Sequence, residues 1–296
     1  MKVSLLRKIL PDSIRVPLAI WLRKRGITTA IQSALHLSEM RRLSADNRNL
    51  KPAPSDAKVL IICAHFNHLQ WLPGCIDSVL AQNHQAWQLI IVDDCSTDSS
   101  ADTIISEQAA RDPRIKAISL SENSGAYIAR NTGFEAADCD WTHVTFIDPD
   151  DVATPEWLEH SLMILMGRQG TVRPALERWN PDYSKMKSIY FGHCQSMHTR
   201  LAWERAGGFL PIRRSADAEL TARLGHLAKD SKTAVYKSWL TAQRMRLVHG
   251  SASTQDLVAR KLWLEQRDDE LSTLAHSDLK IVPKTTAWKD CSDCEN

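Results

Sequence analysis

The 296-residue sequence contains no apolar run long enough to cross a bilayer. Its longest runs, residues 59–64 and 89–92, are far shorter than the roughly 20 residues that a transmembrane helix needs. It also lacks a repeat with a period of about 20–50 residues, which argues against solenoids and propellers. Arg7 and Lys8 interrupt the short apolar start that a signal peptide would need to extend. The seven cysteines are an odd number without a secretory framework, so we expect a reducing, cytoplasmic compartment.

An excess of charge of one sign is also missing, because the net charge is only +2. The charge is nevertheless uneven: residues 1–51 hold eleven Lys or Arg and three acids, whereas the remainder holds 26 bases and 32 acids. Helical spacing of apolar residues near the start predicts a basic amphipathic segment, interrupted by Pro11 and Pro17. The segment either lies on an anionic membrane surface or packs on the body of the protein, and both remain open. The body carries no aromatic and basic stripe, so no nucleic-acid partner is expected.

From residue 58 onwards, short apolar runs alternate with segments of helical spacing. Strands are expected at 59–64, 87–92, 115–120 and 142–147, and helices at 69–82, 99–110 and 125–137. This alternation predicts an α/β fold with a mostly parallel, Rossmann-like sheet flanked by helices, preceded by the basic helical extension.

The alternation fades after Asp151. Helices are expected at 155–166, 199–206 and 217–229, a strand at 187–191, and a loop over 167–186, where the polarity is mixed. The C-x-x-C formed by Cys291 and Cys294 has no second pair, which favours a tail over a zinc site.

Carboxylates follow two of the expected strands. Asp93 and Asp94 come after the second strand, and Asp148, Asp150 and Asp151 come after the fourth. Because the carboxyl ends of parallel strands meet at one edge, these five side chains are expected on one rim. Such crowding is costly without a cation, and carboxylates suit Mg²⁺ or Mn²⁺. The alternative for the Asp-Pro-Asp-Asp stretch is a turn that needs Asp and Pro for its conformation.

At this point a family resemblance appears. Residues 60–151 resemble the nucleotide-sugar-binding half of bacterial-type family 2 glycosyltransferases, which have the GT-A fold and invert the anomeric centre. The similar segments are DSVLAQ at 77–82, IIVDDCSTD at 90–98, NSGAYIARN at 123–131 and FIDPDD at 146–151, the last resembling the family's D-x-D metal motif. The weaker second half has GGF at 207–209, ADAELTARL at 216–224 and RLVHGSAS at 246–253.

The resemblance implies transfer of a sugar from a nucleotide-diphosphate donor, with UDP favoured, to a glycan or lipid-linked acceptor in cell-surface polysaccharide or lipopolysaccharide synthesis. The cofactor would be Mn²⁺ or Mg²⁺, held by Asp150, Asp151 and His249. Asp217 would be the catalytic base, with Glu219 in reserve, although Asp217 could instead cap the following helix. The implied donor contacts are Ala64, Phe66, Asp93, Asp94, Asn123, Gly125, Arg130 and Asp148.

One departure weakens the implied base: Ala216 stands where the family usually has Glu. A non-catalytic nucleotide-sugar or glycan-binding module therefore stays open. A nucleotidyltransferase is a further alternative, although residues 65–68 lack the Gly-rich basic loop that such an enzyme usually has.

On this basis we divide the chain into four parts. They are a basic segment and linker (1–55), a donor-binding half (56–151), an acceptor and catalytic half (152–255) and a C-terminal helix and tail (256–296). The expected location is cytoplasmic, at the inner face of the plasma membrane if the basic segment binds lipid.

Overall fold

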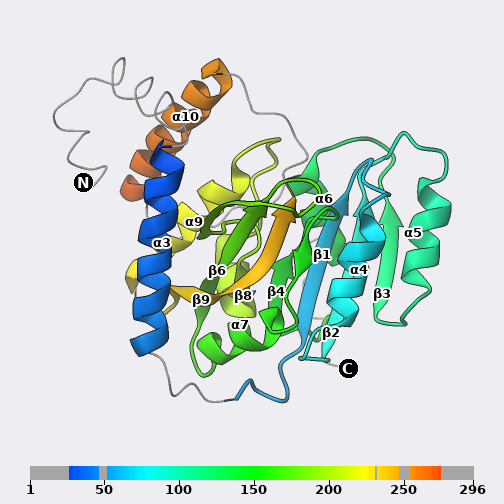
Figure 1. Ribbon diagram of the computed structural model, residues 1–296, viewed down its shortest axis with the longest axis horizontal. Helices are drawn as coiled ribbons and strands as arrows, with labels where there is room; N and C mark the ends of the chain where they lie inside the picture. Colours follow the sequence, from blue (N-terminus) through cyan, green and yellow to red (C-terminus); the bar gives the residue numbers. More distant parts are fainter. Residues whose placement is uncertain (1–26, 47–51, 231, 247–253, 275–296) are drawn as a thin grey trace.

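The computed structural model describes residues 27–46, 52–230, 232–246 and 254–274. One nine-stranded sheet runs through the molecule and is covered by helices on both faces (Figure 1). The strand order is β3-β2-β1-β4-β8-β6-β9-β5, and β7 pairs with β6. Within the described ranges, every helix is too short or too polar to cross a bilayer.

Four parallel strands form the first half of the sheet. β1 is buried along its whole length, because its alternate side chains enter two separate apolar cores on opposite faces. The predicted parallel α/β arrangement is confirmed, with end positions shifted by a few residues. The elements are β1 (Val59–His65), α4 (Leu72–Leu80), β2 (Trp87–Asp93), α5 (Ala101–Ala109), β3 (Ile115–Ser119), α6 (Ala126–Thr132), a 3₁₀ turn η1 (Gly133–Ala136) and β4 (His143–Phe146).

The second half is joined to the first because β8 pairs antiparallel with β4. The two predicted halves therefore share one sheet. The elements are β5 (Val152–Ala153), α7 (Trp157–Leu165), β6 (Gly170–Trp179), β7 (Met186–Phe191), β8 (Met197–Thr199), α8 (Arg200–Ala206), α9 (Ala216–Leu227), η2 (Ala228–Asp230), β9 (Ala234–Arg246) and α10 (Thr254–Thr273). Helices α4, α5 and α7 cover one face, and α6, α8 and α9 cover the other.

The expectation of a loop over 167–186 is wrong, because β6 occupies half of it and pairs with β7, β8 and β9. The polar side chains of β6 obscure the apolar pattern by which a strand is predicted. Neighbouring residues supply hydrogen-bond partners for them, since Arg173 donates to the carbonyl oxygens of Phe191 and Gly192. Pro174 lies where the β6–β9 register shifts, which is where a strand tolerates proline. At Gly170, a Cβ would come within 2.0 Å of the Ala234 carbonyl oxygen, so the strand needs glycine there.

The described part of the N-terminal extension, α3 (Ile27–Asp46), packs on the second half of the sheet (Figure 1). Met40 and Leu43 contact the apolar cluster of Ala175, Ile189 and Phe191. The His36 ring also bonds the Ile189 carbonyl oxygen. Packing on the body therefore holds for this helix, while the basic residues before it lie outside the described residues.

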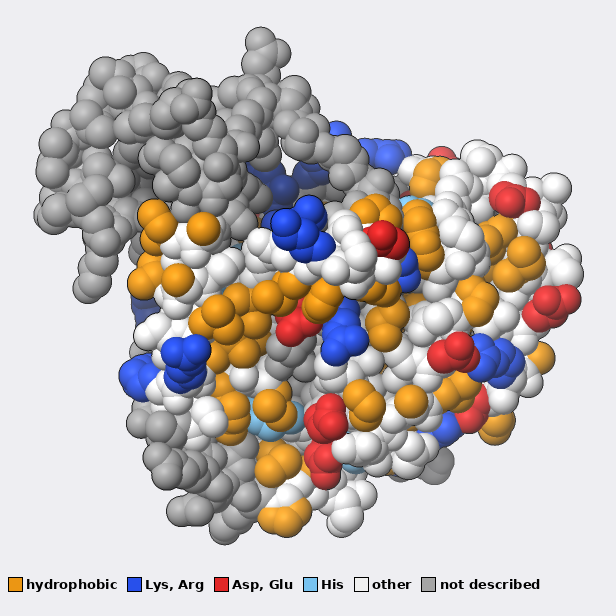
Figure 2. Space-filling view, in the orientation of Figure 1, with side chains coloured by type: hydrophobic (Ala, Val, Ile, Leu, Met, Phe, Trp, Pro, Cys, Tyr) orange, Lys and Arg blue, Asp and Glu red, His pale blue; other side chains and the backbone are white. Residues whose placement is uncertain are grey.

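Charged side chains on the face shown in Figure 2 are mixed in sign. Among the coloured residues of this view, basic and acidic groups are interspersed with apolar ones (Figure 2).

Candidate active site

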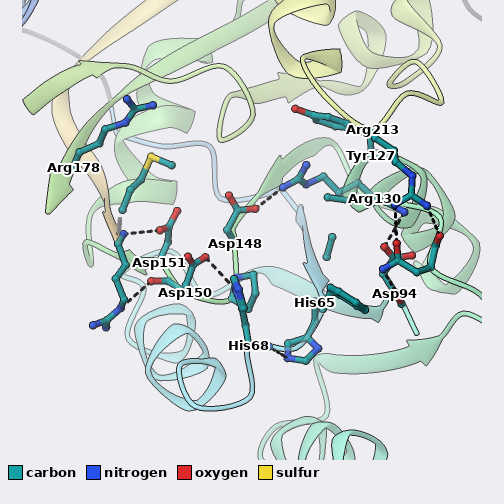
Figure 3. A pocket seen from close by; sticks show the side chains of 18 residues that line it. His65, His68, Asp94, Tyr127, Arg130, Asp148, Asp150, Asp151, Arg178 and Arg213 are labelled. Carbon is teal, nitrogen blue, oxygen red and sulfur yellow. Dashed lines mark hydrogen bonds and ion pairs between the residues drawn. The ribbon is translucent and has the colours of Figure 1, made fainter. Parts of the chain in front are cut away.

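The carboxyl ends of β1, β2 and β4 open into a cavity of about 570 Å³ (Figure 3). The start of α6 and the ends of β6 and β9 complete its wall. Asp93, Asp217 and Glu219 are not in the lining, and His249 lies outside the described residues. The predicted site residues that do line it are Ala64, Phe66, Asp94, Asn123, Gly125, Arg130, Asp148, Asp150 and Asp151.

Asp93 points into the protein rather than into the cavity. Its carboxylate accepts hydrogen bonds from the Ser96 hydroxyl at 2.6 Å and the Ser96 backbone N–H at 3.0 Å. The His65 Nδ1 lies 2.8 Å from the same carboxylate, and the His68 backbone N–H donates to His65 Nε2 at 3.3 Å. Asp93 thus fixes the turns after β1 and β2.

Asp94 lines the cavity, yet its carboxylate already has two donors. The backbone N–H groups of Ser124 and Gly125 each donate to it at 2.8 Å. Gly125 has φ +94°, a conformation that glycine adopts without strain. The Asn123 amide donates to the Asp94 carbonyl oxygen at 3.1 Å, and Arg213 donates to the Asn123 side chain at 2.9 Å. Asp94 therefore shapes the turn that leads into α6.

The carboxylates after β4 form the charged centre of the cavity. Asp148 faces the buried guanidinium of Arg130 and is ion-paired with it (Figure 3). Burial raises the pKa of Asp148, and the Arg130 charge opposes that shift. Burial and the charges of Asp148 and Asp150 raise the pKa of Asp151 well above its usual range. Arg130 thus pairs with one of these three carboxylates.

The chemistry of these oxygens fits a divalent cation. Asp151 Oδ1 accepts a hydrogen bond from the Arg246 backbone N–H at 3.1 Å, whereas the buried Asp151 Oδ2 has no hydrogen-bond partner among the described residues. Asp150 is 7% exposed and lies 3.8 Å from the His68 Nδ1. In the part of the chain that the structure describes, no three His, Cys, Asp or Glu side chains could hold a metal by themselves. Part of the coordination would have to come from a ligand, as is usual for Mg²⁺.

Several lining residues were missed by the sequence reasoning. His68, Tyr127 and Arg213 lie beside motif residues, so their place next to the site could have been noticed. Arg178 belongs to the strand that was expected to be a loop, and no signal in the sequence pointed to it. Figure 3 shows Arg178 on the opposite side of the cavity from Tyr127 and Arg213.

The two candidate bases on α9 differ in environment. Asp217 is half-buried in the first turn and accepts a hydrogen bond from the Tyr127 hydroxyl at 2.6 Å. Ser215 holds the N-cap position, so Asp217 is not the cap. Glu219 is fully buried, ion-paired with Arg223 at 2.9 Å and with Arg267 at 3.4 Å. This burial corrects the reserve assignment, because Glu219 cannot reach a substrate.

The comparisons with known proteins agree with this geometry. The model of glycosyl transferase family 2 matches residues 60–220, which is more than half of the chain. The chain belongs to glycosyl transferase family 2. A Bacillus subtilis glycosyltransferase of teichuronic acid biosynthesis is 40% identical over 110 residues, covering 37% of this chain and 42% of that protein. A Rhizobium meliloti succinoglycan biosynthesis protein is 33% identical over 104 residues, covering 35% and 28%.

Solved structures of low sequence identity share the fold of this family 2 chain. Residues 1–349 of S. aureus TarS, in complex with UDP-GlcNAc, give a TM-score of 0.56 at 15% identity, covering 73% of this chain and 70% of that one. The mannosyltransferase PcManGT from Pyrobaculum calidifontis, in complex with GDP-Man and Mn²⁺, gives 0.57 at 14% identity, covering 89% and 84%. The GT-A fold is therefore confirmed. The sequence match to the two relatives above spans less than half of their length.

The bonding of Asp94 predicts a structural effect in the absence of any nucleotide. Asp94→Asn places an amide donor against one of the two backbone N–H groups, so we expect the free energy of unfolding to fall by about 1–3 kcal/mol. Urea denaturation without ligand measures it. The control is Asp77→Asn, whose carboxylate is 63% exposed in a surface ion pair and should change stability by less than about 1 kcal/mol. Equal stabilities for the two variants would contradict the assignment.

Proposed function

We propose that this chain transfers a sugar, with inversion, from a nucleotide-diphosphate donor to an acceptor hydroxyl, using Mn²⁺ or Mg²⁺. The observation that carries the proposal is the group of carboxylates after β4, facing Arg130 in a cavity at the strand ends of a family 2 chain. In open α/β sheets this edge is where ligands bind. The cavity volume of about 570 Å³ is within the range of small-molecule sites.

The donor nucleoside lies over the ends of β1 and β2 in this proposal. Phe66 is 39% exposed at the cavity, so its ring is open to stack on a base beside Ala64. Asn123 and Gly125 form the floor, and Asp94 contributes by holding that floor in place. Asp148 contacts the ribose while paired with Arg130. UDP is the favoured nucleotide, and the UDP-GlcNAc complex of S. aureus TarS supports it.

Asp150 and Asp151 would hold the metal, and we assign His249 as a further ligand. When bound, the cation offsets the charge that develops on the leaving diphosphate. Asp150 and Asp151 supply carboxylate oxygens, and the buried Asp151 Oδ2 supports this assignment because it lacks another partner among the described residues. The Mn²⁺ in the PcManGT complex supports the choice of ion.

Asp217 acts as the base. It takes the proton of the acceptor hydroxyl, whose oxygen attacks the anomeric carbon as the bond to the diphosphate breaks on the opposite face. An in-line displacement of this kind inverts the anomeric centre.

The acceptor is a cell-surface glycan or its lipid-linked precursor, and the sugar is transferred at the cytoplasmic face of the membrane. The names of the Bacillus subtilis and Rhizobium meliloti relatives support a polysaccharide product. The excess of bases in residues 1–51 supports contact with an anionic membrane surface.

The metal assignment is tested by donor binding. UDP-, GDP-, CDP- and dTDP-sugars are compared by thermal shift, with and without Mn²⁺, on the wild-type chain and Asp150→Ala. A ligand at a hundred times its Kd raises the free energy of unfolding by about 2.7 kcal/mol. The sugar nucleotides of one nucleobase should therefore give an Mn²⁺-dependent rise in Tm, which Asp150→Ala abolishes. Asp140→Ala is the control, because that carboxylate is 59% exposed and pairs with Lys58. Undiminished binding by Asp150→Ala would refute the assignment.

The catalytic base is tested by turnover. The substrate is the nucleotide sugar that the thermal-shift panel identifies, and water is the acceptor. Asp217→Asn should release nucleoside diphosphate at least about 100-fold more slowly than wild type. Its donor Kd should stay within about twofold, and ¹H NMR of the wild-type product should show the anomer opposite to the donor's. Asp268→Asn, on exposed α10, is the control. Donor binding without wild-type turnover would instead identify a binding module.

A further inference from the structure

Tyr127 connects the two halves of the site. It lies on α6, in the segment that shapes the donor cavity, and its hydroxyl donates to Asp217 Oδ1 at 2.6 Å across 90 residues of sequence. Its ring packs against Phe209 with centroids 5.2 Å apart, and the Arg130 guanidinium carbon lies 5.3 Å from the ring centroid. The phenol is therefore held in place on two sides.

In the Tyr127–Asp217 hydrogen bond, the hydroxyl is the donor and the carboxylate is the acceptor. Burial and the charge of Asp217 raise the pKa of Tyr127 far above its usual range, so the phenol keeps its proton and donates it. In the described ranges, the carboxylate of Asp217 accepts no other side-chain hydrogen bond. Oδ1 is thus occupied, and Oδ2 is left to receive a proton.

We propose that Tyr127 is a positioning residue that orients the Asp217 carboxylate toward the acceptor hydroxyl. The inference rests on the proposed role of Asp217 as the base. Because Tyr127 lines the donor cavity, the same bond ties Asp217 to the wall of that cavity. Positioning of this kind matters for rate, since small misplacements of a reacting group slow the reaction strongly.

Other groups around Asp217 do not supply this orientation. Thr221 donates its hydroxyl to the Asp217 backbone carbonyl at 2.9 Å and leaves the carboxylate alone. His193 bonds Thr221 at 2.9 Å, and burial lowers its pKa to about 4, so its ring is neutral near pH 7. The charge of Asp217 also acts on four other ionisable groups, which are Asp148, Arg173, Tyr190 and Cys194.

The test separates orientation of the base from support of the fold. Tyr127→Phe removes only the hydroxyl, and we expect release of nucleoside diphosphate to water to fall about 10- to 100-fold. The donor Kd, measured as in the panel above, should stay within about twofold. Tyr236→Phe is the matched control, because Tyr236 is half-buried on β9 outside the cavity lining and packs on the core.

Azide supplies the readout that a structural defect would not give. As an anion it attacks the anomeric carbon without losing a proton, forming a carbon–nitrogen bond as the bond to the diphosphate breaks. The quantity to compare is the rate of nucleoside diphosphate release with azide divided by the rate with water alone. We expect this ratio to be about tenfold or more higher in Tyr127→Phe and in Asp217→Asn than in wild type.

The outcomes distinguish the two claims. Wild-type rates in Tyr127→Phe beside an inactive Asp217→Asn would overturn the positioning role and leave the base in place. Wild-type rates in Asp217→Asn would overturn the base and the inference with it. A loss in Tyr127→Phe that azide does not restore, or that appears equally in the donor Kd, would show a structural role and overturn the inference.

Discussion

The negative charge gathered after β4 is the constraint on which the site depends. Asp148, Asp150 and Asp151 are held within four residues at the end of a buried strand, and burial raises the pKa of Asp148 and of Asp151. Arg130 pairs with one of them. In the function we propose, a divalent cation bound by these carboxylates attracts the diphosphate of the donor. The proposed metal site, the proposed donor pocket and the proposed inversion all depend on this arrangement.

The fold supplies that arrangement in two steps. Parallel pairing of β1, β2 and β4 brings the strand ends together, and the antiparallel β4–β8 pair then extends the sheet so that β6 and β9 close the cavity. Arg246, at the end of β9, fixes Asp151 through its backbone N–H. The carboxylate of Asp151 is therefore positioned by a strand from the second half of the sheet.

Short-range patterns predicted the first half of the fold, whereas the second half depends on long-range pairing. β1 could be predicted because a strand covered on both faces must be apolar throughout. β6 could not, because Arg173 is satisfied by carbonyl groups of a strand that follows it. Motif spacing found the acids after β2 and β4, but not that Asp93 and Asp94 bond to the protein itself. Glu219 looked available in sequence, since Arg223 and Arg267 become its partners only on folding.

Anomalous diffraction at the manganese edge tests the central claim most directly. Crystals of the chain grown with Mn²⁺ and the nucleoside diphosphate that binds would be measured above and below that edge. The account predicts one peak within about 2–2.5 Å of an Asp150 carboxylate oxygen, with diphosphate oxygens completing its coordination. A bound nucleotide with no peak at the end of β4, or a peak held by other residues, would contradict it.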